Sequence, residues 1–185
     1  MIVLGLDIST SITGYCLMDT EQPLGHRLIE ADGLIISHKK DSYTKSVLTR
    51  DVLLDLGKRY DIERVIVEEN LQAFRRGLSS AKTLSTLARF NGIVCFLAQD
   101  TLKIPVEMIN VNTARAKVGL KVNRKIEDPI KDQIVEWVKS QPDFSNFKWP
   151  TKKLKSGPRK GMTVLEKKCY DIADAAVVCL SAFQA

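Results

Sequence analysis

The sequence predicts an α/β domain with a mixed five-stranded sheet, in which three antiparallel strands are followed by two parallel ones and helices flank the sheet. Two apolar runs of strand length, at 2–6 and 64–67, are separated by an amphipathic helical segment. That order is typical of a right-handed crossover between parallel strands. Two more strand-like runs follow the first one at hairpin spacing, which indicates the antiparallel half of the sheet.

The first strand is expected at 2–6, where Ile-Val-Leu-Gly-Leu is apolar on both faces. It ends in Asp7, and a hydroxyl-rich turn at 9–11 follows. Residues 13–18 are typical of the antiparallel return strand, and residues 27–36 complete a three-stranded meander.

Residues 42–60 predict an amphipathic helix packed on the sheet, because apolar side chains recur at every fourth position. These side chains are Leu48, Val52, Leu56 and Tyr60. The strand at 64–67 then lies parallel to the first strand, so the acids that follow both strands emerge at the same edge of the sheet. Successive strand residues point to opposite faces, so only one of Glu68 and Glu69 can join Asp7.

The second half of the chain predicts a long helix at 78–99, a strand at 104–109 and short helices at 112–118 and 128–139. A last helix is expected from about Thr163 to Phe183. The long helix is apolar over more than one face, which is typical of a helix enclosed in the core or shared with a second subunit.

The composition fits one globular domain over 1–185, since 44% hydrophobic and 27% charged residues are ordinary for a chain that buries its own core. No apolar run approaches the roughly 18 residues of a membrane span, and Asp7 interrupts the N-terminal run before it could act as a signal peptide. We therefore expect a cytoplasmic protein. The four cysteines are far apart, so neither a zinc site nor a disulfide framework is indicated.

The net charge of +6 is concentrated between 148 and 168, which holds eight Lys or Arg and a single acid. Much of this segment, about 142–161, has three prolines, two glycines and no periodicity, so a basic loop or insertion is expected. It is either a solvated loop or an arm that contacts phosphates. Its candidate DNA-binding residues are Lys152, Lys153, Lys155, Arg159 and Lys160.

Two further acids lie in the last helix. Asp171 and Asp174 are three residues apart and share a helical face. A solvated acidic face is the ordinary explanation for such a pair. However, no other charged residue occurs from Ile172 to Phe183, which favours a packed helix that points its carboxylates at a site.

If Asp7, Glu68, Asp171 and Asp174 converge, each pair at about 4 Å repels by on the order of 4 kcal/mol at an effective dielectric constant near 20. Such a cluster needs protons or divalent cations. Oxygen ligands favour a hard ion, and paired hard ions are a common device for phosphodiester cleavage. The acids and the basic segment together predict a nuclease.

These motifs resemble those of the RuvC-type Holliday-junction resolvases of the RNase H-like superfamily. The similar stretches are DIST-x-x-TGY from Asp7, VIVEEN from Val65 and D-x-x-DA from Asp171, and the first is most similar in phage-encoded members. The resemblance covers nearly the whole chain except about 142–161. It implies a magnesium-dependent endodeoxyribonuclease that cuts four-way DNA junctions, in the cytoplasm of a bacterial host if the chain is phage-encoded.

By position in these motifs, the resemblance implies that Asp7, Glu68, Asp171 and Asp174 are the catalytic, metal-binding acids. Two Mg²⁺ ions per site are expected, with Mn²⁺ able to substitute. Lys167 lies one turn before Asp171 and is a candidate to steady the scissile phosphate or the attacking water.

The resemblance also implies a homodimer, expected to form through the helix at 78–99, and an aromatic wedge that opens the junction. The available aromatic is Phe74, three residues later than expected, with Arg75 and Arg76 beside it. These residues are suited to stack on an unpaired base and bind its phosphates. Phe74 could equally be a hydrophobic staple for the next helix.

A second basic cluster could track the duplex arms of a junction or simply be a solvated surface. Its members are Arg115, Lys117, Lys121, Arg124 and Lys125.

Three other functions are compatible with parts of the sequence. A general branched-DNA nuclease or a non-catalytic junction-binding protein would share most of these features. Sugar kinases and related ATPases also begin with a strand, an Asp and a phosphate-binding turn. Ser9, however, stands where such turns need Gly, and at 185 residues we do not expect a second domain of similar size.

Overall fold

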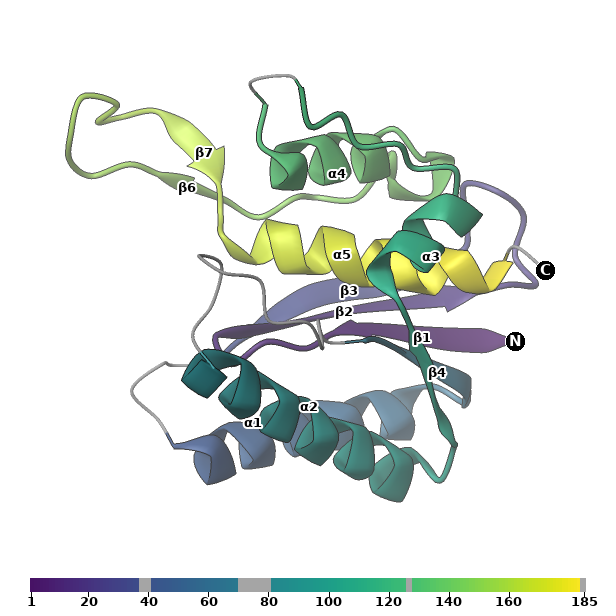
Figure 1. Ribbon diagram of the computed structural model, residues 1–185. Coiled ribbons are helices and arrows are strands. Elements are labelled where there is room, and N and C mark those ends of the chain that lie inside the picture. The colour runs from purple at the N-terminus through teal and green to yellow at the C-terminus, as the bar shows by residue number, and fades with distance from the viewer. Residues whose placement is uncertain (37–40, 70–80, 126–127, 184–185) are drawn as a thin grey trace.

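The computed structural model describes residues 1–36, 41–69, 81–125 and 128–183. A central sheet lies between two layers of helices (Figure 1). Its strands are β1 (Ile2–Asp7), β2 (Ile12–Asp19), β3 (Leu28–Ile35), β4 (Ile62–Glu68) and β5 (Val106–Ile109), in the order β3-β2-β1-β4-β5. The strands β1, β2 and β3 pair antiparallel, whereas β4 pairs parallel with both β1 and β5. The predicted mixed sheet is therefore confirmed.

Two helices cover one face of the sheet and three lie on the other (Figure 1). The first pair is α1 (Ser42–Arg59) and α2 (Ala81–Leu102), and the other three are α3 (Val111–Lys117), α4 (Ile130–Lys139) and α5 (Lys168–Leu180). Each face has its own core. Leu4, Val65 and Phe90 are buried on the α1 and α2 side, and Val3 and Ala176 are buried on the α5 side.

The helix α1 forms as predicted, with the side chain of Asp41 capping its first turn through the backbone N–H of Thr44 at 2.9 Å. Its buried face differs from the expected apolar stripe, because Lys45 and Thr49 are buried alongside leucines. The Lys45 side chain reaches back to the turn after β1, where its ammonium donates to the carbonyl of Thr10 at 2.6 Å. This contact ties α1 to the loop that follows Asp7.

The basic segment contains more regular structure than the sequence predicts. It forms a short 3₁₀ helix (Pro142–Phe144) and a hairpin of β6 (Thr151–Lys153) and β7 (Thr163–Leu165). The expectation that the last helix begins at about Thr163 is wrong, because Thr163 to Leu165 pair with β6 and α5 begins only at Lys168.

Two glycines let α5 lie directly on the strands. A Cβ atom on Gly5 of β1 would be 2.6 Å from the carbonyl oxygen of Ala175, and one on Gly14 of β2 would be 2.0 Å from that of Asp171. Any larger residue at these positions would push α5 away from the sheet. Within the part of the chain that the structure describes, no helix is long and apolar enough to cross a membrane.

Candidate active site

Asp7 and Glu68 end neighbouring parallel strands. The register pairs Leu6 with Val67, and in each strand the next residue is the acid. The two carboxylates therefore lie at the same edge of the sheet, as the crossover between β1 and β4 predicts.

The helix α5 brings the other two acids to this edge. Gly14 is the cross-strand partner of Asp7 and is also the glycine that touches the backbone of Asp171. The first turn of α5 is thus held beside the end of β1. Asp174 follows Asp171 by three residues, and its side chain is only 15% exposed.

The proton affinities of these acids reflect their burial and their proximity. Burial raises the pKa of Asp7 well above its usual range, and the charges of Glu68, Asp174 and Asp171 raise it further. Burial, followed by the charge of Asp174, raises the pKa of Glu68 to about 7. Burial raises the pKa of Asp171 to about 6 and also raises that of Asp174. The four predicted acids therefore form one electrostatically coupled cluster, here called the acid cluster.

Two basic side chains balance part of this negative charge. Arg115 of α3 donates to a carboxylate oxygen of Asp174 at 3.4 Å and is itself only 18% exposed. Its buried Nε has no hydrogen-bond partner among the described residues. The sequence groups Arg115 with cations that track DNA, but the structure brings its guanidinium to the acid cluster.

The second cation, Lys131 of α4, was not identified from the sequence. Its charge lowers the pKa of every member of the acid cluster. Its ammonium lies 5.8 Å from the ring centroid of Tyr170, the residue before Asp171. Lys131 lies on the exposed face of an amphipathic helix, where the sequence does not separate such a lysine from any other solvated one. Only the packing of α4 against α5 reveals its position.

The donor chemistry of the acid cluster suits a hard divalent cation, because every donor is a carboxylate oxygen and burial penalises the bare charges. Among the described residues, no three His, Cys, Asp or Glu side chains lie close enough together to enclose an ion as they stand. Arg115 holds Asp174 in this arrangement. Asp7, Glu68, Asp171 and Asp174 therefore stay the metal-ligand candidates that the sequence predicts.

The turn after Asp7 is closed on itself. The hydroxyl of Ser9 donates to the carbonyl of Ile12 at 2.6 Å and accepts the backbone N–H groups of Ser11 and Ile12. These bonds give the turn a compact form whose hydroxyl is already engaged by the backbone. They disfavour the nucleotide-binding turn of an ATPase.

The remaining candidates are exposed side chains or lie outside the described residues. Lys167 is the exposed N-cap residue of α5. The other cations of the second basic cluster are exposed, namely Lys117, Lys121, Arg124 and Lys125. Those of the hairpin are exposed as well, namely Lys152, Lys153, Lys155, Arg159 and Lys160. The predicted wedge, Phe74 with Arg75 and Arg76, lies outside the described residues.

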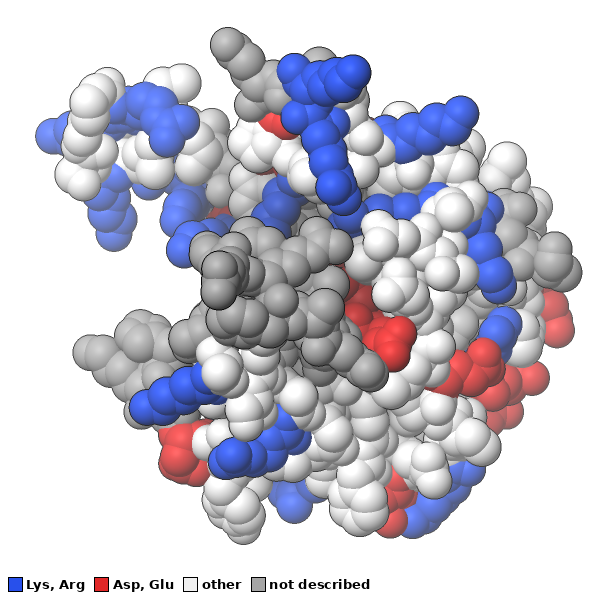
Figure 2. Space-filling view, viewed as in Figure 1, with Lys and Arg blue, Asp and Glu red and all other residues white. Residues whose placement is uncertain are grey.

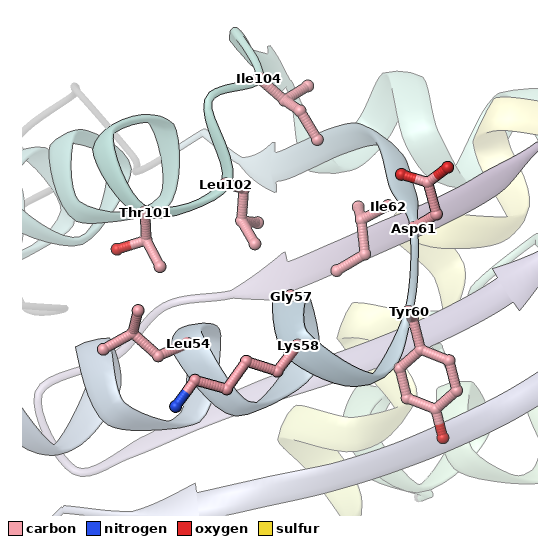
Figure 3. Close-up of a pocket in the computed structure, with 9 residues that line it drawn as sticks. All are labelled: Leu54, Gly57, Lys58, Tyr60, Asp61, Ile62, Thr101, Leu102 and Ile104. Atoms are coloured by element: carbon pink, nitrogen blue, oxygen red, sulfur yellow. The ribbon is translucent and has the colours of Figure 1, made fainter.

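A separate hollow of about 210 Å³ lies between the last turns of α1 and α2, where Lys58, Asp61 and Thr101 line it (Figure 3). Ile62, the first residue of β4, also lines this hollow, whereas Glu68 ends the same strand. Six residues of strand correspond to roughly 20 Å. The hollow is therefore remote from the acid cluster.

No protein-family model matches the sequence, and no curated protein sequence matches it. Similarity is found in solved structures instead. RuvC of Thermus thermophilus matches with a TM-score of 0.63 and 19% identity over 99% of this chain and 94% of that one. The same protein in complex with a Holliday junction substrate matches with a TM-score of 0.62, 17% identity and coverages of 99% and 93%.

The yeast mitochondrial Holliday junction resolvase matches with a TM-score of 0.58 and 14% identity, over 98% of this chain and 77% of that one. At such identities the similarity concerns the fold. The chain therefore has the RNase H-like fold in the form seen in RuvC and related junction resolvases.

Proposed function

We propose that the chain is a structure-selective endonuclease that cuts four-way DNA junctions by metal-dependent phosphodiester hydrolysis. The observation that carries the proposal is the acid cluster, in which three separate elements bring four acids to one edge of a resolvase-type fold. Solved structures of this fold include junction-resolving proteins, one of them bound to a Holliday junction.

Asp7, Glu68, Asp171 and Asp174 would hold the metal, with Mg²⁺ as the proposed ion and Mn²⁺ as a substitute. When bound, two Mg²⁺ ions supply the positive charge that activates a water and stabilises the leaving 3′ oxygen. The acids, whose pKa values are raised in the free protein, must be ionised for this role.

Arg115 and Lys131 are the basic side chains whose charges lower the pKa of Asp174 in the acid cluster. In the free protein they offset carboxylate repulsion. With DNA bound, either could also face the negative charge of the scissile phosphate, a role that the sequence suggests for Lys167.

The exposed cations would supply most of the binding energy through counterion release, so affinity and cleavage should be separable. We further propose a homodimer formed through α2, because two strands of like polarity at symmetric positions require two active sites.

The decisive experiment compares a four-way junction, a Y-fork and a linear duplex as substrates, each with and without Mg²⁺. Paired symmetric nicks in the four-way junction, dependent on Mg²⁺, are expected. Equal cutting of the fork would indicate a general branched-DNA nuclease. Binding without any cut in Mg²⁺ or Mn²⁺ would indicate a junction-binding protein and reject the proposed activity.

The acid cluster is tested by Asp7→Asn. Because Asp7 is half-buried and the charges of the other three acids all raise its pKa, the substitution should lower the cleavage rate by about 10²–10³-fold or more. Its Kd for the junction in Ca²⁺ or EDTA should stay within about threefold of wild type, since affinity depends on the exposed cations. Cleavage by Asp7→Asn at the wild-type rate in Mg²⁺ would contradict the assignment.

A further inference from the structure

The hairpin of residues 151–165, here called the arm, projects from the molecule beyond the first turn of α5 (Figure 1). All three residues of β6 are exposed, and so are the residues from Lys155 to Thr163. In the space-filling view its Lys and Arg side chains form a blue group that stands clear of the body (Figure 2). Only the base of the arm packs on the domain, where Leu165 of β7 contacts the core, and most of the rest of the ribbon is exposed.

The base of the arm is firmly anchored. The rings of Phe144, Phe147 and Trp149 pack together, with centroids 5.0 Å apart for the closest pair. The carbonyl of Pro150 accepts the backbone N–H of Glu166 at 3.0 Å and the thiol of Cys169 at 3.2 Å. The arm therefore leaves the body in a defined direction, between the aromatic cluster and α5.

The tip of the arm is also built as a ribbon. Beyond the paired strands, the N–H of Leu154 donates to Met162 at 2.9 Å, and the N–H of Gly161 donates back to Leu154 at 2.9 Å. Gly157 and Gly161 have φ values of +81° and +89°, which a turn at the tip requires. The hydrogen-bonded ribbon thus continues past β6 and β7.

The charge of the arm is of one sign. No acid occurs from Phe144 to Leu165, and the five Lys and Arg of the arm form no ion pair with other described residues. Alternation in β6 puts Lys152 and Lys153 on opposite faces. An isolated two-stranded ribbon is marginally stable in water, and unpaired like charges weaken it further. Such a ribbon gains stability when a polyanion neutralises it.

We propose that the arm enters the major groove of a duplex arm of the DNA substrate, beside the strand that is cut. This inference rests on the proposed function. A two-stranded ribbon fits the major groove, about 12 Å wide, and is too broad for the minor groove, about 6 Å wide. Since β7 leads into α5 through only Glu166 and Lys167, the bound duplex would adjoin the acid cluster.

The test replaces residues 154–162 by Asn-Gly, which closes β6 and β7 with a two-residue turn and leaves the base intact. Three cations are removed: Lys155, Arg159 and Lys160. We expect junction affinity to fall on the order of tenfold or more, and the slope of log K against log salt to become shallower by about 2.7, at about 0.9 per lost phosphate contact. The control Lys58→Gln/Lys103→Gln removes two exposed cations remote from the arm and should change neither quantity.

Groove insertion is separated from phosphate contact by dimethyl sulfate footprinting of guanine N7, which lies in the major groove. The wild-type protein should protect guanines on one duplex arm, and the shortened variant should not. The protection and the affinity difference should both disappear when that duplex is RNA, whose major groove is deep and narrow. Reactive guanines in the wild-type complex, or equal affinities of the two proteins, would overturn the inference.

These outcomes are independent of the cleavage assay. If the wild-type protein cuts junctions without protecting guanine N7, insertion of the arm into the major groove is rejected and the proposed nuclease activity stands. If the protein cuts no substrate in Mg²⁺ yet protects guanine N7 on a linear duplex, the proposed nuclease activity is rejected and insertion of the arm into the major groove stands.

Discussion

Lys131 is a residue of the site that the sequence does not predict, and its charge acts on all four acids. The acids themselves could be predicted, since each ends a strand or interrupts an apolar helix. Lys131 could not, because its position depends on how α4 lies across α5. The same holds for Arg115, whose buried pairing with Asp174 has no sequence pattern.

Lys131→Met should lower kcat for junction cleavage by on the order of 10²-fold, because it removes a positive charge that acts on all four acids. The Kd for the junction should change by less than about threefold. Lys131→Arg should restore part of kcat. Single-turnover cleavage and equilibrium binding measure the two quantities, with Lys58→Met as a control on a remote exposed lysine. A fall in affinity with unchanged kcat would show that Lys131 only binds DNA.

Glu68→Gln should stabilise the metal-free protein at neutral pH. The folded pKa of Glu68 is raised to about 7 from 4.5, so its favourable contribution is complete below pH 4.5 and is lost as pH rises toward 7. Removing the ionisable group should raise Tm at pH 7.5 by about 2–4 °C, which corresponds to about 1 kcal/mol, and should flatten the fall in Tm between pH 4.5 and 7. Thermal melts in EDTA measure this. The control Asp61→Asn changes an exposed acid and should melt like wild type at each pH. If Glu68→Gln instead has a lower Tm than wild type at pH 7.5, ionising Glu68 does not destabilise the folded protein and the prediction is wrong.

At the scale of elements, the order of strands and helices could be predicted because each long element has a clear period. The hairpin could not, because β6 and β7 have only three residues each and β6 contains no apolar residue. Its missed pairing also explains why α5 was expected to begin near Thr163. The seating of α5 on Gly5 and Gly14 is a second feature that only the structure shows, since a glycine in a strand does not indicate which element approaches it.

Gly14→Ala tests this seating. A methyl group there would lie 2.0 Å from the backbone oxygen of Asp171, and backbone atoms cannot move aside as a flexible side chain can. The shift of α5 should cost about 1–3 kcal/mol of unfolding free energy and reduce cleavage more than junction binding. The matched control is Gly92→Ala in α2, where nothing lies within 4 Å and stability should rise by up to about 1 kcal/mol. Urea melts compare the two, and equal effects would refute close packing at Gly14.

At the scale of the whole molecule, the proposed DNA contact and the proposed self-association use different surfaces. The arm carries five exposed cations, whereas an apolar groove of about 350 Å³ lies between α1 and α2. Tyr43 and Phe96 at this groove are 79% and 68% exposed, which is unusual for large apolar side chains next to Val47, Ile93 and Leu97. The wide apolar coverage of α2, which the sequence indicates, thus continues onto an open surface.

Phe96→Glu should therefore convert a dimer into a monomer, because a charge placed at the centre of an apolar interface cannot be desolvated cheaply. Sedimentation equilibrium in the micromolar range measures the mass, and the dissociation constant should rise by on the order of 10²-fold or more, about 2.7 kcal/mol. The monomer should nick junctions on one strand only, since paired cuts need two linked sites. Leu24→Glu is the matched control, because Leu24 is 63% exposed on the turn between β2 and β3. If Phe96→Glu remains dimeric and still makes paired nicks, the two-fold interface lies elsewhere than on α2.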